Sequence, residues 1–228
     1  MHKITSLKLA TLVFSLFAAS FSQSIAQKRL DIGLMVGPEF NHIHFTKKID
    51  SDISSSPKLG FIVDGHLQLN LTSHLSIDIG IGYANKRFKQ TQSDLIFSSS
   101  INDNGTFEYS QVEVWASNHV GQAPVMLKYY FGNADMRFFA GLGGNSMLTF
   151  HRATKGLITH PNGNTEDLEW SGGTSFFDFS AQAAFGVMKP LDERHRLNIE
   201  LYSNVFPLSY EHRLIYMVTT GLRIGIWI

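Results

Sequence analysis

The sequence predicts an all-β fold, an eight-stranded antiparallel up-and-down transmembrane β-barrel with short periplasmic turns and longer extracellular loops. Three observations predict it. Apolar and polar residues alternate in eight segments, the connections between segments alternate short and long, and the less apolar face of the segments is rich in glycine and isolated charges. Period-two alternation is typical of strands, and no segment has a convincing helical period. At 228 residues the chain fits one such domain.

The first three segments carry the alternation most clearly. They run from Leu30 to Phe45, from Lys58 to Leu71 and from His74 to Tyr83. In the third segment one face carries Leu75, Ile77, Ile79 and Ile81, and the other carries Ser76, Asp78, Gly80 and Gly82. Successive strand side chains point to opposite sides, so each segment has one apolar face and one small or polar face.

Five further segments complete the barrel. They are a segment that ends in residues 123–131 (APVMLKYYF), then Met136 to Arg152, Phe177 to Val187, Leu197 to Tyr202 and Tyr216 to Ile228. The last one has the polar-x-Gly-x-x-apolar-x-apolar shape of a barrel-assembly signal, carried by Thr219, Gly221, Ile224 and Ile226. We expect this last strand to close the barrel.

The connections between the segments differ in length. LTSH, GNAD and LDERH are tight, whereas Thr46 to Pro57, the region beyond Phe88 and Ala153 to Thr174 are long and polar, with Pro207 to Arg213 as a short exception. Short periplasmic turns and long outer loops are typical of membrane barrels. In the second loop, the turn signal NDNG at residues 102–105 lies between two strand-like stretches. We expect a hairpin over about residues 89–117 that projects above the membrane.

The N-terminus has the features of a secretory signal peptide. Lys3 and Lys8 give a basic start, Leu9 to Phe21 form an apolar run, and Ser24-Ile25-Ala26 is a small-x-small cleavage site. A transmembrane helix is the alternative, but the run is shorter than the roughly 20 residues that a bilayer needs. We expect a signal peptide over residues 1–26 and an exported barrel domain over residues 27–228.

Composition excludes several classes of function. Lys+Arg and Asp+Glu each total 19, so no charge excess indicates a nucleic-acid partner. The chain has no cysteine, which excludes disulfides, iron–sulfur ligation and thiol chemistry. After the signal no apolar run is long enough for a spanning helix, so any membrane role has to use strands.

The minority face of the segments indicates which side meets lipid. A soluble lipocalin-like barrel shows the same alternation, but a face rich in Gly and Ala with isolated charges fits the crowded interior of an eight-stranded barrel. Aromatic residues near both ends agree with interfacial girdles. At the tight-turn end these are Tyr129, Phe131, Phe138 and Trp227, and nearer the long loops Phe40, Tyr83, Phe88, Phe150, Phe177, Phe206 and Tyr216. We expect Leu75, Ile77, Ile79 and Ile81 to face acyl chains.

Four stretches of the mature chain resemble the PorT-like family of bacterial outer-membrane β-barrels. They are DIGLMVGPEF (31–40), QAPVMLKYYFG (122–132), FFAGLGGN (138–145) and NIELYSNVFPLS (198–209). The resemblance covers nearly all of the mature chain in layout, although its motifs are barrel patterns and not chemical signatures. It implies an eight-stranded barrel in the outer membrane, and some relatives are linked to protein secretion and surface assembly.

Charged residues on the inner face form the most mechanistic candidate site. Asp78 and Lys128 lie at similar heights on neighbouring segments, as do Glu200 and Arg223, which predicts two cross-strand ion pairs in the lumen. Arg137, Asp64 and Asp178 are candidates to extend this network. The network is either a static plug or part of a narrow, selective pore for small solutes or ions, and eight strands leave little room for water.

Metal, cofactor and catalytic sites are not predicted. His42 and His44 could share a strand face as metal ligands, but no carboxylate cluster supports them, and the other histidines are scattered. A lipid-modifying enzyme is the third alternative, and it needs a His and a Ser near the outer leaflet. The only His-x-Ser, His74-Leu75-Ser76, lies beside a periplasmic turn, and Gly-x-Ser-x-Gly is absent.

The projecting hairpin is the candidate surface for a protein partner. Phe107, Tyr109 and Trp115 lie in or beside the strand-like stretch FEYSQVEVWAS, which could pair with the edge of a partner's sheet. We expect a monomeric barrel with a structural or partner-binding role, which contacts outer-membrane lipid through its wall and an envelope or secreted protein through its extracellular loops.

Overall fold

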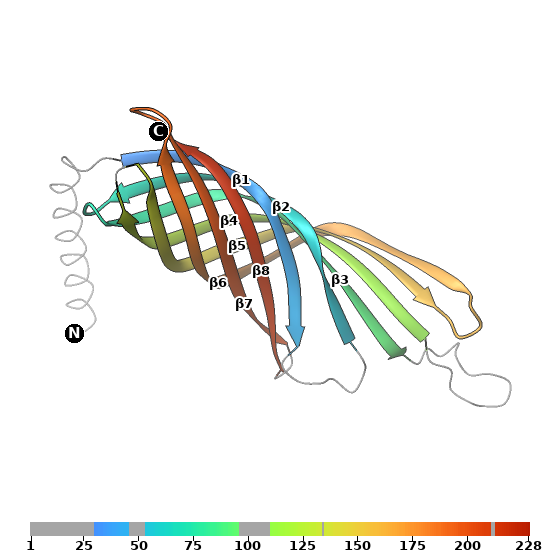
Figure 1. The fold of residues 1–228 in the computed structure, drawn as a ribbon. Helices are drawn as coiled ribbons and strands as arrows, with labels where there is room; N and C mark the ends of the chain where they lie inside the picture. Colours follow the sequence, from blue (N-terminus) through green and yellow to red (C-terminus); the bar gives the residue numbers. More distant parts are fainter. Residues whose placement is uncertain (1–29, 46–52, 96–109, 134, 211–212) are drawn as a thin grey trace, which may run out of the picture.

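The computed structural model describes residues 30–45, 53–95, 110–133, 135–210 and 213–228, which form a closed barrel (Figure 1). Its strands are β1 (Leu30–Phe45), β2 (Ile53–Asn70), β3 (Leu75–Leu95), β4 (Ser110–Gly132), β5 (Arg137–Thr159), β6 (Thr165–Pro190), β7 (Arg196–Tyr210) and β8 (Arg213–Trp227). The predicted signal peptide, residues 1–26, lies outside the described residues. Within them, no helix is long and apolar enough to cross a membrane.

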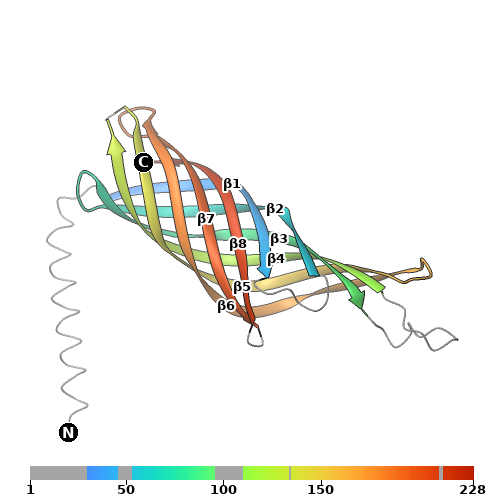
Figure 2. The ribbon, with the colours of Figure 1, turned by 60° about the horizontal axis from the view of Figure 1, so that its bottom comes forward.

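Every strand pairs antiparallel with its neighbours in the chain, and β1 also pairs with β8. The closing register sets Gly33 opposite Trp227 and Val36 opposite Ile224. Tight turns join β2 to β3, β4 to β5 and β6 to β7 at one end of the barrel, where the chain also ends (Figures 1 and 2). We call this the turn end and the opposite one the hairpin end. The predicted eight-stranded up-and-down barrel is confirmed.

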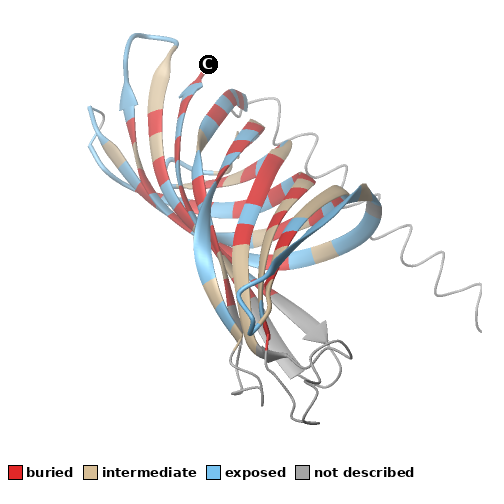
Figure 3. Cartoon of the chain, turned by 90° about the vertical axis from the view of Figure 1, so that its right-hand side faces the viewer, coloured by how far each residue is buried: buried red, intermediate tan, exposed pale blue. Residues whose placement is uncertain are grey.

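The barrel is apolar outside and polar inside. Ile81 and Leu142 are 75% and 72% exposed on the outer wall, whereas Lys128 and Glu200 are 0% exposed in the lumen. Buried and exposed residues alternate along the strands (Figure 3). A soluble barrel has the opposite arrangement, so this pattern excludes the lipocalin-like alternative. Ile79 and Ile81 face outward as predicted, and Leu75 and Ile77 share their face, half-buried between neighbouring side chains.

Four strands extend well beyond the barrel at the hairpin end (Figure 1). β3 and β4 pair as far as Leu95 and Ser110, and β5 and β6 as far as Thr159 and Thr165. We call this four-stranded extension the projecting sheet. The predicted hairpin over residues 89–117 is therefore present as strands where it is described, and its tip, residues 96–109, lies outside the described residues.

Strand extends into two of the predicted long loops. Ala153 to Thr174 was expected to be a loop, but β5 and β6 continue through it to a turn at His160–Asn164, where Gly163 has φ +83°. Likewise β2 begins at Ile53, inside the predicted loop Thr46 to Pro57. Apart from Gly156 and Ile158, which are buried, the described side chains on both faces of these stretches are at least partly exposed, so their sequence need not alternate.

Three of the predicted girdle aromatics point inward instead. Trp227, Phe88 and Phe206 are 0%, 5% and 1% exposed and lie in the lumen. Trp227 shares its strand face with Arg223, and it fits because Gly33 lies opposite: a Cβ on Gly33 would come within 2.6 Å of the indole. The glycines of the inner face thus make space for large side chains. Tyr129, Phe131, Phe138, Phe40, Phe150 and Phe177 do face outward.

Candidate functional site

Six side chains form a closed ring of contacts across the lumen, which we call the charge ring. It runs from Asp64 on β2 to Arg223 on β8, Glu200 on β7, Lys128 on β4, Asp78 on β3 and His66 on β2, and back to Asp64. Lys128 Nζ lies 2.6 Å from Asp78 Oδ2 and 2.7 Å from Glu200 Oε2. Arg223 contacts Glu200 and, at 2.9 Å, Asp64. All six side chains are buried.

Strand register explains how these residues meet. Glu200 and Arg223 are direct cross-strand partners. Asp78 lies opposite Met126, so Lys128 reaches it diagonally from two residues along β4. Directly opposite and diagonal neighbours are the pairs that a sheet brings into contact. The geometry therefore brings together both of the ion pairs expected from the sequence and joins them through Lys128 and Glu200.

Of the other three predicted lumen charges, Asp64 joins the charge ring, whereas Arg137 and Asp178 do not. Asp64 belongs to the charge ring, where it also accepts a hydrogen bond from Gln122 at 2.8 Å. Arg137 lies apart at the turn end, and Asp178 is half-buried on β6 and has no ion pair with any described residue. The prediction that Arg137 and Asp178 extend the network was wrong. Arg137 immediately follows the turn into β5, and Asp178, opposite Met147, lies too far towards the hairpin end.

A second charged layer lies nearer the hairpin end, and sequence reasoning missed it. Lys86 Nζ lies 3.1 Å from Glu39 Oε2, which also accepts a hydrogen bond from the Tyr202 hydroxyl at 2.9 Å. Asn41 donates to Glu39 at 3.4 Å. Glu39 and Lys86 are on strands that do not adjoin, so no cross-strand register signals the pair. The sequence feature that could have identified each residue is a charged side chain at an inward-facing strand position.

Apolar clusters lie above and below these charges. Towards the hairpin end, the lumen is filled by Ile43, Phe88, Ala116, Val120, Met147, Phe206 and Met217. Towards the turn end, it is filled by Met35, Tyr130, Phe139, Met188 and Trp227. An ion that crosses the barrel would have to leave water at both clusters, which is costly for a charge. This filling argues against an open pore.

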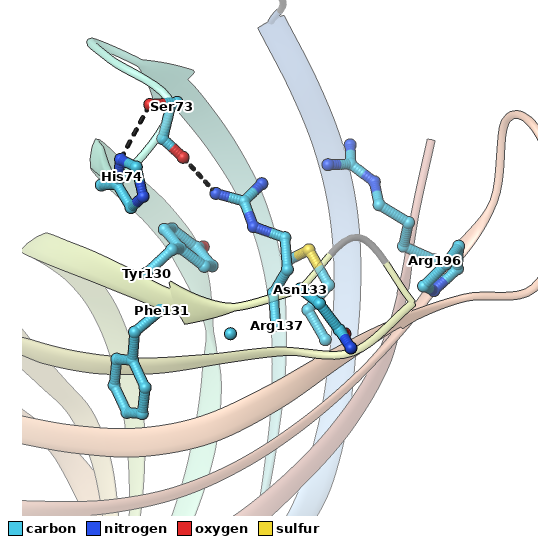
Figure 4. Close-up of a pocket in the computed structure, with 10 residues that line it drawn as sticks. Ser73, His74, Tyr130, Phe131, Asn133, Arg137 and Arg196 are labelled. Carbon is cyan, nitrogen blue, oxygen red and sulfur yellow. Dashed lines mark hydrogen bonds between the residues drawn. The ribbon is translucent and has the colours of Figure 1, made fainter.

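The turn end of the lumen opens into a hollow of about 460 Å³ (Figure 4). Arg137 donates a hydrogen bond to the carbonyl oxygen of Ser73, and its guanidinium lies 4.6 Å from the centre of the Tyr130 ring. Arg196 makes an ion pair with Asp31 at 2.5 Å. Both guanidinium groups at this mouth are thus held by the barrel itself.

The alternatives that need a reactive or metal-binding cluster gain no support from the geometry. His74 Nδ1 lies 2.8 Å from Ser73 Oγ in the exposed turn, while Ser76 is buried in the lumen, so the His74-Leu75-Ser76 pair is not brought together. Among the described residues, no three or more His, Asp or Glu side chains gather to hold a metal ion. The side chain of His44 lies outside the described set.

The projecting sheet has a free edge along β6 in the described part of the chain. β6 pairs with β7 only from Ala181 to Pro190, so residues 165–180 have β5 on one side and no strand of the described chain on the other. Leu168 and Trp170 on this stretch are 44% and 49% exposed. Of the predicted partner contacts, Trp115 lies on the same sheet, with Lys89 Nζ 5.1 Å from its ring, and Phe107 and Tyr109 lie outside the described residues.

A closed antiparallel barrel with an apolar outer wall and a charged lumen is a transmembrane β-barrel, the architecture that lets strands cross an outer membrane. A family model described as "Outer membrane protein beta-barrel domain" matches residues 21–210, and the chain belongs to this family. Its location is the outer membrane, as predicted. This match shows the broad family, and membership in the PorT-like group stays a prediction.

Solved structures that are similar to this chain include three outer-membrane proteins. Neisserial surface protein A has 9% identity and a TM-score of 0.43, with 86% of this chain and 96% of that chain covered. OprG from Pseudomonas aeruginosa has 9% identity and a TM-score of 0.41, with 88% and 95% covered. The outer membrane protease OmpT from Escherichia coli has 9% identity and a TM-score of 0.38, with 88% and 96% covered. No curated protein matches the sequence significantly.

Proposed function

We propose that this outer-membrane barrel is a docking protein, which binds an extended segment of an extracellular or secreted protein along the free edge of β6. The observation that carries the proposal is the unpaired stretch of β6 over residues 165–180, held above the membrane by a closed and filled barrel. An unpaired strand edge offers a row of backbone donors and acceptors, and a partner strand can add to it.

Charge on this edge supports a basic partner. Glu166, Asp167 and Glu169 lie within its first five residues and are exposed. Two such acidic edges repel one another, whereas a strand with Lys or Arg residues pairs favourably with them, since opposite charges on facing strands attract. The partner is therefore a basic segment, and a second copy of the barrel is disfavoured. This agrees with a monomeric barrel.

The resemblance to PorT-like barrels supports a role of this partner in secretion or surface assembly. The filled lumen supports docking over conduction, because the barrel then serves as a rigid anchor for the projecting sheet. A catalytic role has no comparable support among the described residues, where the His and Ser side chains weighed for it do not meet.

In-cell photo-crosslinking tests the proposal. A photo-reactive phenylalanine derivative replaces Trp170, and in a control the same derivative replaces Leu191, which is similarly exposed at the turn end. We expect one discrete extracellular adduct from position 170 and none of the same size from position 191. The combined change Glu166→Lys and Glu169→Lys should abolish the adduct, while Glu193→Lys should leave it unchanged. An adduct insensitive to Glu166→Lys and Glu169→Lys would overturn edge docking.

A further inference from the structure

We propose that a groove on the outer wall of the barrel binds the phosphorylated headgroup of an outer-leaflet lipid. The groove has a volume of about 570 Å³ and lies where β2, β3, β4 and β5 leave the barrel for the projecting sheet. Its wall residues include Lys58, Arg87 and Lys155, together with Leu59 and Trp115. It is separate from the lumen, and it adjoins the free edge of β6 through the Lys155–Glu169 pair.

Side-chain size explains the hollow. Ser117 and Ala153 are cross-strand partners and form its floor. Arg87 lies opposite Ser117, and Trp115 lies opposite Lys155, so long side chains flank the two small ones. Register therefore builds a depression with cationic ends into a sheet that would otherwise be flat.

The height of the groove matches the lipid headgroups. One step nearer the turn end, the same outer face carries Tyr83, His119 and Phe150, whose rings lie within 6.4 Å of one another. The Tyr83 hydroxyl lies 2.6 Å from His119 Nδ1. Amphipathic aromatic clusters of this kind lie at the membrane–water interface. The groove begins where this cluster ends, so its cations lie just beyond the interface, at the level of the lipid phosphates, with Trp115 beside Lys155.

The charges in the groove are complementary to phosphate. Three of its lining residues are cationic and none is acidic. Lys58 and Arg87 make no ion pair with any described residue, and Arg87 Nε donates a hydrogen bond to Asn85 Oδ1 at 2.7 Å. Lys155 pairs with Glu169 at 3.1 Å, but both side chains are well exposed, and such pairs are weak. The groove thus offers uncommitted donors beside an apolar surface, as a phosphorylated amphiphile requires.

The test is a binding titration of the refolded full barrel domain in detergent micelles, with bisphosphorylated lipid A as probe. Matched probes are the dephosphorylated form of the same lipid and inorganic phosphate. Each basic residue near a membrane surface contributes about 1 kcal/mol towards anionic lipid, so Lys58→Gln, Arg87→Gln and Lys155→Gln together should weaken binding on the order of 100-fold. Lys189→Gln, which removes an exposed lysine near the turn end, should leave the affinity unchanged.

Several outcomes separate the groove from general lipid affinity. Arg87→Lys keeps the charge and should keep most of the affinity, which distinguishes lost charge from lost folding. Heat-modified gel migration reports whether each variant is a folded barrel. Equal affinity for the dephosphorylated lipid, or an unchanged affinity in the folded triple variant, would overturn the proposal. Inorganic phosphate that binds as tightly as the lipid would show that the occupant is a soluble anion, and the lipid assignment would then be wrong.

Discussion

At the scale of single residues, the charge ring is the feature with the largest energetic consequence. A buried charge is costly unless it is paired, and the removal of one partner leaves the other desolvated and alone. In the ring, each charged member contacts at least two others, so its carboxylates and cations share their partners. The ring is therefore a cooperative unit and not a set of independent pairs.

Asp78→Ala should lower the free energy of unfolding by roughly 3–5 kcal/mol, because Lys128 then loses one of its two buried carboxylates. The addition of Lys128→Ala should cost less than the two single changes summed. Equilibrium urea unfolding of the barrel in lipid vesicles measures both effects. The exposed pair Lys155–Glu169 is the control, and its removal should cost about 0–1 kcal/mol. Additive losses at Asp78 and Lys128 would contradict a shared unit.

Much of this site was predictable at the residue scale because strand parity fixes which charges face inward. Glu200 and Arg223 could be paired from sequence, since they lie at similar distances from the turn end on two consecutive strands, and the register makes them direct partners. His66 was not predicted to join the charge ring. It lies opposite Gly80, and its side chain contacts Asp78 two residues along β3, which the cross-strand register alone does not indicate. Trp227 was expected in an aromatic girdle because it is aromatic and lies near the turn end. It is four residues from Arg223 on the same strand, however, so both side chains face the lumen.

At the scale of elements, the tight turns set the register of the whole barrel. In the turn between β6 and β7, one Asp192 carboxylate oxygen accepts hydrogen bonds from the backbone N–H groups of His195 and Arg194 at 2.7 and 2.8 Å. These bonds favour the ionised form and lower the pKa of Asp192 to about 2. The ionised side chain therefore stabilises the turn at neutral pH.

The pH dependence of this turn follows from the lowered pKa. The stabilisation is fully present above the ordinary carboxyl pKa of about 4 and is lost as the pH falls towards 2. Asp192→Ala should consequently lower the Tm at pH 7, and the difference from the unchanged protein should shrink between pH 4 and pH 2. Thermal unfolding followed by circular dichroism measures it. A difference that stays constant across this interval would contradict the assigned bonds.

Element existence was easier to predict than element length. All eight strands were found where one face meets lipid, because lipid imposes strict alternation. The outer halves of β5 and β6 were expected to be loop, since residues such as Glu169 and Gly172 stand where both faces meet water and no alternation is required. These regions are strands because they pair with neighbouring strands, and strand pairing is hard to predict from a single sequence.

At the scale of the whole molecule, the lumen is filled at successive levels while the sheet above it is open at one edge. The two apolar clusters enclose the charged layers from both ends. An eight-stranded barrel has an interior just wide enough for side chains to fill it. The molecule therefore has a rigid, closed base and a single extended side.

The barrel should be electrically silent. In a planar bilayer, the refolded protein should give no steady single-channel conductance, because the apolar clusters block a hydrated path. Lys128→Ala and Arg223→Ala should leave the record silent as long as the barrel remains folded, since neither residue belongs to those clusters. A stable conductance that changes in either variant would show that the charge ring lines an open pathway.

The position of Arg223 also dictates an order of assembly. This residue lies on the last strand to emerge, yet it contacts Asp64 on β2 and Glu200 on β7. Until β8 arrives, both carboxylates lack their guanidinium, and an unfinished barrel would have to carry uncompensated charge into the bilayer. The strand that closes the seam with β1 is therefore also the strand that supplies the guanidinium to both carboxylates, so barrel closure and charge compensation in the lumen depend on the same segment.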